Sequence, residues 1–345
     1  MGEELGKTFY PVITETKRKR LEKSWAQTFY QEFFCRIDEE AFSVLYMDYP
    51  SRPNVPINWL VGLSVLEAGY GWSDEELYDH FCFDLQVRYA LGLHDLHEGD
   101  FDLRSLDYFW ERLSCYNLEH GVNLLNQAFE KITDKQIKML KLKTGRQRMD
   151  STMVSSNILD MSRLQLLVTA LQRIYLALSE SDQQRYAKTF APCLSGHAGQ
   201  SVYRIKGKKA VEKQLNKIGK LMQRLLAKLR EAYGEELAYQ VLLRLFKDNF
   251  RLEETEVYAK ATEELETGCL QSVDDLEATY RKKGQRKYKG YGVNLSETCN
   301  SENELQLITQ VQVAPNIVDD TQLLSEGLPN SKERTSVEVR YTDGG

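Results

Sequence analysis

The chain has 345 residues, of which 42% are hydrophobic, so it is long enough to form two or three domains with buried cores. Its six cysteines lie far apart and form no C-x-x-C pair, which excludes a zinc ribbon and a compact disulfide framework. No apolar run approaches the length of a spanning helix, so we expect a cytoplasmic protein with reduced thiols and no membrane partner.

The formal net charge is −6, which by itself argues against nucleic-acid binding. Phosphate contacts, however, are made by local patches, and basic residues cluster in three places along the chain. These are Lys17 to Arg20; Arg204, Lys206, Lys208 and Lys209; and the six cations between Arg281 and Lys289. A solvated helix face or loop explains each cluster equally well when it is taken alone.

The first 140 residues are predicted to be helical. Residues 1–50 carry an aromatic-rich helical pattern without an evident role. Pro56 can open a helix over 57–68, where apolar residues recur at close to a helical period. Ser73 and Glu76 form a capping box for the next helix, and further helices are expected at 85–91 and 103–113.

The rest of the chain is predicted to combine a small sheet with a helical block. Between about 155 and 280, few prolines and apolar residues at a helical period indicate an all-α insertion. Alternating patterns predict strands on both sides of this block. The predicted order is a strand over 147–149 ending at Asp150, the insertion, strands over 289–298 and 305–313, a short helix over 319–328, and a strand over 336–342 ending at Asp343.

Several ordered segments resemble DDE transposases of bacterial insertion sequences that have an InsH-like N-terminal domain. In the N-terminal part they are Pro56-x-x-Trp59-Leu60, Gly71-Trp72-Ser73-Asp74-Glu75-Glu76-Leu77, the run from Phe83 to Leu93, and the run from Asp102 to Leu113. In the C-terminal part they are Met149-Asp150-Ser151-Thr152, Lys289-Gly290-Tyr291, the run from Val311 to Asp320, and Tyr341-Thr342-Asp343-Gly344-Gly345.

The resemblance implies a mainly α protein with an α/β part. It divides the chain into a helical extension (1–50), an InsH-like helical DNA-binding domain (51–140), and an RNase H-like DDE catalytic domain (141–345), whose sheet is interrupted by the helical insertion. Asp150 and Asp343 would then be catalytic residues that bind Mg²⁺ or Mn²⁺ for DNA strand cleavage and transfer at insertion-sequence ends. The expected partners are transposon-end and target DNA and a second copy of the chain in a synaptic complex, in a bacterial cytoplasm and on the nucleoid when DNA is bound.

In this family a third acid, a glutamate, follows the second aspartate well downstream. Only Gly344 and Gly345 follow Asp343 here, so we expect a sheet that lacks its last strand, an exposed edge at the fourth strand, and no catalytic activity for this chain by itself. One alternative function is a non-catalytic DNA-binding protein that occupies transposon ends as an inhibitor. Another is an unrelated all-α scaffold with a small sheet.

Each candidate residue also has a structural explanation. Asp150 is suited to an Asx-turn or a helix N-cap, and Asp343 lies in a turn-forming Thr-Asp-Gly-Gly sequence. Asp319 and Asp320 are rivals for the second acid, although helix capping explains them better. The basic cluster at 281–289 is interpreted either as a phosphate-contacting segment or as a flexible linker. The candidate DNA contacts are Arg104, Arg112, Lys282, Lys283, Arg286, Lys287 and Lys289.

Overall fold

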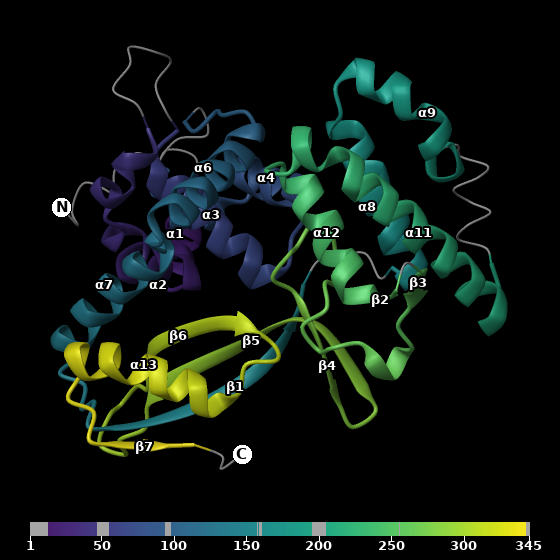
Figure 1. Cartoon of the computed structure of the whole chain (residues 1–345). Helices are drawn as coiled ribbons and strands as arrows, with labels where there is room; N and C mark the ends of the chain where they lie inside the picture. The colour runs from purple at the N-terminus through teal and green to yellow at the C-terminus, as the bar shows by residue number, and fades with distance from the viewer. Residues whose placement is uncertain are drawn as a thin grey trace. The chain divides into compact units, whose positions relative to one another are not determined.

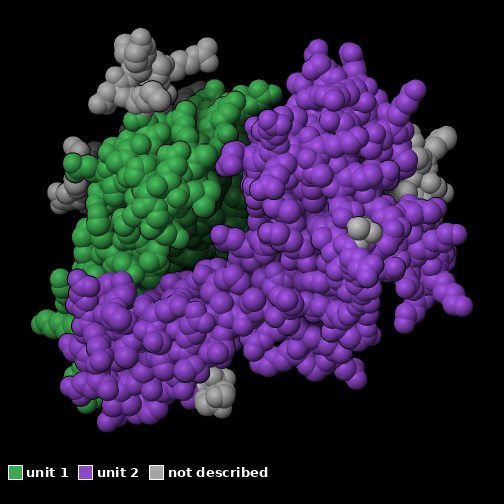
Figure 2. Space-filling view, in the orientation of Figure 1, with its two compact units in different colours: residues 1–143, 301–309 green, residues 144–300, 310–345 purple. Residues whose placement is uncertain are grey.

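The structure, a computed structural model, describes residues 13–46, 55–93, 98–156, 158, 161–194, 205–254 and 256–342. The chain divides into two compact units, shown in Figure 2. Unit 1 comprises residues 1–143 and 301–309, and unit 2 comprises residues 144–300 and 310–345. Helices dominate both units, and unit 2 also holds a mixed sheet, as the patterns predict.

Unit 1 is built from helices whose ends are set by local capping signals. The predicted helices over 57–68 and 103–113 are confirmed, and the first of them ends at Gly71, which has a left-handed conformation with φ 71°. The capping box of Ser73 and Glu76 is present. The elements are α1 (Glu15–Glu22), α2 (Trp25–Glu32), η1 (Phe34–Arg36), η2 (Glu39–Leu45), α3 (Ile57–Tyr70), α4 (Asp74–Phe83), α5 (Leu85–Ala90), α6 (Arg104–His120) and α7 (Leu124–Met139).

The extension before residue 50 shares the core of unit 1. Phe34 and Phe42, from the two 3₁₀ segments, are buried in the same cluster as Leu63 and Phe109. Arg88 is also buried there, and its guanidinium donates hydrogen bonds to the carbonyls of Phe81 (3.0 Å) and Glu98 (2.8 Å). Residues 34–45 therefore belong to the fold of this unit and do not form a separate appendage.

The first part of unit 2 is a helical bundle with its own apolar core. Helix α11 packs against α8 and α12, and the arrangement can be followed in Figure 1. The bundle consists of α8 (Arg163–Ala177), α9 (Glu180–Leu194), α11 (Lys208–Tyr233) and α12 (Leu237–Asn249).

The prediction of an all-α insertion is wrong, because an antiparallel hairpin follows α12. Its strands are β2 (Phe250–Glu253) and β3 (Glu256–Ala259). Phe250 and Val257 are buried against α11, where a Cβ on Gly219 would lie 2.7–2.8 Å from their side chains. The strands have only four residues each, so their alternation is too short to be read from the sequence.

The second part of unit 2 is a five-stranded sheet with the order β4-β5-β1-β7, in which β6 also pairs with β5. β1 is antiparallel to β5 and parallel to β7. The predicted sequence of strand, insertion, strand, strand, helix and strand is observed, with β4 as an additional strand. The elements are β1 (Arg146–Ser155), β4 (Thr279–Lys283), β5 (Arg286–Thr298), β6 (Ile308–Pro315), α13 (Asp320–Arg334) and β7 (Val339–Tyr341).

Helix α13 covers one face of this sheet through polar contacts (Figure 1). The amides of Gln310 and Gln312 donate to the carbonyls of Gly327 and Leu323, both at 2.9 Å, and Ser331 donates to Gln310. A Cβ at Gly327 would lie 2.6 Å from the Gln312 side-chain oxygen, so a larger residue there would displace the end of that side chain. The opposite face of β1 is exposed, and it carries Asp150.

Candidate functional site

Asp150 lies in the middle of β1, because the strand continues to Ser155. The predictions that Asp150 ends a strand or caps a helix are therefore wrong. Residues 151–155 pair with Asn294 to Gly290 on β5 in one continuous antiparallel register, which overrides the turn-forming character of the Asp-Ser-Thr sequence. Side chains alternate along a strand, so Asp150 shares the exposed face of β1 with Arg148 and Thr152.

The carboxylate of Asp150 lies on this exposed face near the Arg148 guanidinium. Arg148 forms a cross-strand ion pair with Glu297, and this hydrogen bond raises the pKa of the Arg148 guanidinium. Asp150 itself has no hydrogen-bond or ion-pair partner within the part of the chain that the structure describes, and the residue opposite it is Leu295. A carboxylate with both oxygens available on an open face is suited to a hard cation.

Asp343 lies outside the described residues, so its distance from Asp150 is untested. The neighbouring strand β7 runs parallel to β1 and pairs Arg146 with Val339, Gln147 with Arg340, and Arg148 with Tyr341. In the sequence, Asp343 is two residues beyond Tyr341, just as Asp150 is two residues beyond Arg148. Among the described strands, β7 pairs with β1 alone and forms the edge of the sheet.

The rival acids have structural roles. The side chain of Asp319 caps α13 by accepting a hydrogen bond from the backbone N–H of Gln322 at 3.0 Å, as the capping interpretation predicts, and Asp320 begins that helix. Glu297, which faces Arg148, is held in the ion pair. No group of three His, Cys, Asp or Glu side chains that could hold a metal ion occurs among the described residues.

Asp275 is a half-buried acid that sequence reasoning missed. It accepts hydrogen bonds from Ser156 and from Tyr291, the latter at 2.6 Å, and so joins the end of β1 to β5 where the chain returns from the insertion. Burial opposes its ionisation, but these hydrogen bonds outweigh burial and hold the pKa of Asp275 below its ordinary value. No motif marks this role of Asp275 in the sequence, because its side-chain partners Ser156 and Tyr291 are more than 15 residues away.

The basic cluster at 281–289 forms the tip of a β-hairpin, which we call the basic hairpin (residues 279–290). Its register sets Lys282 opposite Lys287 and Lys283 opposite Arg286, and Gly284 turns the chain with φ 63°. The flexible-linker interpretation is therefore wrong. Like charges that face each other across two strands destabilise the pair, and none of these four cations has an acidic partner in the described ranges.

One buried asparagine fixes the base of the basic hairpin. The Asn316 side chain accepts a hydrogen bond from Thr279 (3.0 Å) and donates one to the carbonyl of Tyr288 (3.3 Å). Its backbone carbonyl accepts a hydrogen bond from Arg281 at 2.9 Å, so Arg281 supports the hairpin and is not a free cation. The Asn316 side chain thus connects both strands of the hairpin to the end of β6.

The other candidate DNA contacts lie in unit 1, on α6. Arg104 and Arg112 are both exposed, but the Arg112 guanidinium lies over the ring of Tyr46, 5.1 Å from its centroid. The candidate residues thus fall into two groups, Arg104 and Arg112 in one unit and the basic hairpin in the other.

No family model matches the chain, and neither a curated protein nor a solved structure is significantly similar to it. Among the helices of the described ranges, none is long and apolar enough to cross a membrane. Function is therefore argued from the geometry of unit 2 and from the sequence.

Proposed function

We propose that this chain is a DDE-type transposase in which Asp150 and Asp343 together bind a divalent cation. The spacing of the two acids in the sequence carries the proposal: β1 and β7 are parallel neighbours that pair Arg148 with Tyr341, and each aspartate is two residues beyond its member of this pair. Residues paired in parallel strands point to the same face, about 4.8 Å apart, which suits two carboxylates that share one ion.

The topology of the sheet supports the same proposal. The strand order β6-β5-β1-β7, with β1 antiparallel to β5, parallel to β7, and α13 between β6 and β7, is that expected of an RNase H-like domain. In such a domain the first acid lies on the central strand, as Asp150 does. A fold admits many functions, so the acids and not the topology carry the chemistry.

The residues of this chain have distinct roles in the proposed reaction. Asp150 and Asp343 would hold Mg²⁺ or Mn²⁺ at the open face of the sheet, and the ion when bound would stabilise charge on the phosphodiester oxygens. Arg148 and Glu297 neutralise each other and leave Asp150 available. The basic hairpin, with Arg104 and Arg112, would contact transposon-end and target DNA, and a second copy of the chain would complete a synaptic complex.

Metal binding tests the assignment directly. In a titration with Mn²⁺, Asp150→Asn and Asp343→Asn should lower the affinity to a similar extent. The double variant should bind Mn²⁺ no more weakly than the single variant with the lower affinity. Asp319→Asn is the matched control, because it also removes one carboxylate but only caps α13. Independent, additive effects of the two aspartates would show that they do not share an ion.

DNA binding without cleavage is the second candidate function. It is favoured by the basic hairpin, whose cations Lys282, Lys283, Arg286 and Lys287 have no acidic partner in the described ranges. A chain of this kind would occupy transposon ends and block the active enzyme. Mg²⁺-dependent nicking of a transposon-end duplex that Asp150→Asn abolishes would exclude it, whereas tight binding with no turnover in Mg²⁺ or Mn²⁺ would favour it.

A further inference from the structure

Helix α11 carries a stretch of basic residues with no acidic ones, although the chain as a whole is acidic. Between Glu212 and Glu231 the sequence contains no Asp or Glu, although the whole chain has more acidic than basic residues. Six cations occupy this stretch: Lys213, Lys217, Lys220, Arg224, Lys228 and Arg230.

Five of these cations form a continuous row along the helix. Lys213, Lys217, Lys220, Arg224 and Lys228 are spaced three or four residues apart, which places them on one side of a helix, and all are exposed. We call this row the α11 stripe. The buried residues Ile218, Met222 and Leu225 recur on the opposite side, against the core of the bundle. The stripe thus faces away from the core.

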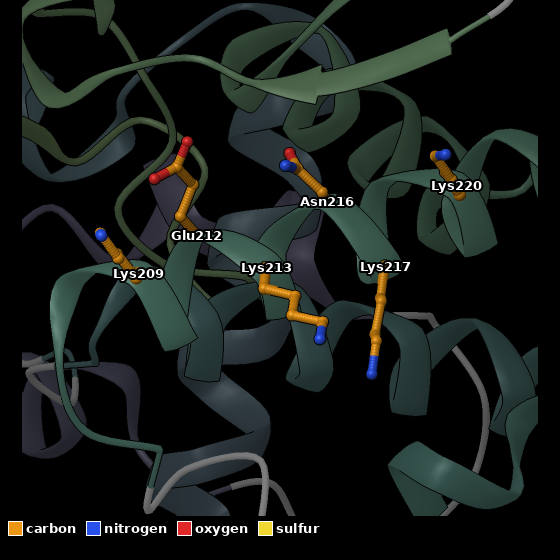
Figure 3. A pocket seen from close by; sticks show the side chains of 6 residues that line it. All are labelled: Lys209, Glu212, Lys213, Asn216, Lys217 and Lys220. Carbon is orange, nitrogen blue, oxygen red and sulfur yellow. The ribbon is translucent and has the colours of Figure 1, made fainter.

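The charges on the stripe are mostly uncompensated. Lys220 pairs with Glu256 of the hairpin β2–β3. The other four have no acidic partner in the described part of the chain. Lys213 and Lys217 project from the same side of the helix, whereas Glu212 and Asn216 point the other way (Figure 3). Like charges four residues apart oppose helix formation, so this row works against the folding of the helix that carries it.

The stripe also borders a concave surface. A hollow of about 590 Å³ lies between α9 and α11, and Lys188 from α9 lines it together with Lys217 and Arg224. Cations on two helices therefore flank one groove. From Lys213 to Lys228 the helix rises about 22 Å, at about 1.5 Å per residue, which is about two thirds of a turn of B-DNA.

We propose that the α11 stripe binds the phosphate backbone of double-stranded DNA. A row of exposed cations, four of the five without an acidic partner among the described residues, suits contact with successive phosphates of a duplex and needs no base-specific contact. The choice of DNA as the polyanion rests on the proposed function. The stripe adds a contact surface on the helical insertion, separate from the basic hairpin and from Asp150.

The test compares two variants with equal loss of charge. The stripe variant is Lys213→Gln with Lys217→Gln, and the control variant is Lys247→Gln with Lys332→Gln, which removes two exposed lysines of unit 2 from α12 and α13. Affinity for a 30-base-pair duplex of arbitrary sequence is measured by fluorescence anisotropy over a range of NaCl concentrations, in EDTA so that metal binding plays no part.

The stripe variant should lose about 1.8 units of log–log salt slope, since each phosphate contact contributes about 0.9. If the stripe variant and the unmodified chain bind DNA equally well near 1 M salt, this loss of slope corresponds to about 60-fold weaker binding by the variant at 0.1 M salt. The control variant should keep the slope of the unmodified chain. Equal slopes for all three proteins, or equal losses in both variants, would overturn the proposal.

Two further measurements distinguish the loss of DNA contacts at the α11 stripe from misfolding and from failure of the proposed metal site. The stripe variant should unfold at a urea concentration no lower than that of the unmodified chain, because a repulsive pair has been removed, so weaker binding cannot come from misfolding. Mn²⁺ titration of the same variant should be unchanged. If Asp150 and Asp343 share an ion but the stripe variant keeps the salt slope of the unmodified chain, only the stripe proposal is refuted. If the stripe variant loses salt slope but the two aspartates contribute independently to Mn²⁺ binding, only the transposase proposal is refuted.

Discussion

Replacement of Asn316 by Ala should detach the base of the basic hairpin from the end of β6. Asn316 is 1% exposed, and its amide links the Thr279 hydroxyl to the Tyr288 carbonyl. These two groups lie on the two strands of the hairpin, so a single side chain clamps both. Without it, the tip keeps its turn at Gly284 but loses its anchor to the sheet.

The expected destabilisation is about 2–3 kcal/mol. Each of the two lost hydrogen bonds contributes about 1 kcal/mol net, and the Thr279 hydroxyl, which is buried, is left without a partner at a further cost of about 1 kcal/mol. Asn316→Asp should be at least as destabilising, because it would bury a carboxylate that faces the Tyr288 carbonyl and cannot donate to it.

A double-mutant cycle with Thr279→Val, followed by urea unfolding, measures the clamp itself. Asn316→Ala and Thr279→Val should couple by about 1 kcal/mol, because each removes one end of the same hydrogen bond. A cycle between Asn330→Ala on α13 and Thr279→Val is the control and should show no coupling. A coupling within error of zero for the Asn316 pair would refute the clamp, even if Asn316→Ala is destabilising.

Three further changes probe the sheet and unit 1. Gly290→Ala should destabilise unit 2 by more than about 1 kcal/mol in urea unfolding, because Gly290 has φ 140° and an added Cβ would lie 2.4 Å from the β1 backbone; unchanged stability would contradict the strand register. Burial raises the pKa of Glu67 to about 7, so between about pH 4.5 and 7 the folded state holds a proton that the unfolded state has released. Thermal stability should therefore fall as pH rises through this range, and Glu67→Gln should flatten the dependence. A thermal stability of the unmodified chain that does not change with pH would disprove this. Arg148→Gln should strengthen Mn²⁺ binding at Asp150 several-fold by removing a nearby cation and releasing Glu297; weaker binding would show that Arg148 supports the site.

Local signals in the sequence were sufficient for many of the elements. The capping box at Ser73 and the left-handed turn at Gly71 depend on neighbouring residues only, so the ends of α3 and α4 could be predicted. The alternation of β5 was also readable, because its residues alternate between more and less buried positions, whereas the burial of β6 does not alternate. Such patterns reflect short-range geometry, which the sequence displays directly.

The structural features that the sequence did not predict depend on contacts between distant residues. Asp150 was expected at a strand end, yet pairing with residues 290–294, more than 130 positions later, extends β1 to Ser155. The clamp at Asn316 and the hydrogen bonds of Asp275 join segments that are far apart or irregular, and no local pattern announces them. The α11 stripe is present in the sequence, but its cations lie three or four residues apart and form no consecutive basic cluster.

The two basic surfaces of unit 2 share a physical property that bears on function. Lys282 faces Lys287 across the basic hairpin, and Lys213 lies one helical turn from Lys217, so each surface sets like charges side by side without acidic partners among the described residues. Both arrangements oppose folding when the protein is free. A bound polyanion would reverse the sign of these interactions, because anything that binds only the folded state stabilises it. We therefore expect the free energy of unfolding to increase with DNA concentration, and this stabilisation by DNA to decrease as salt is added.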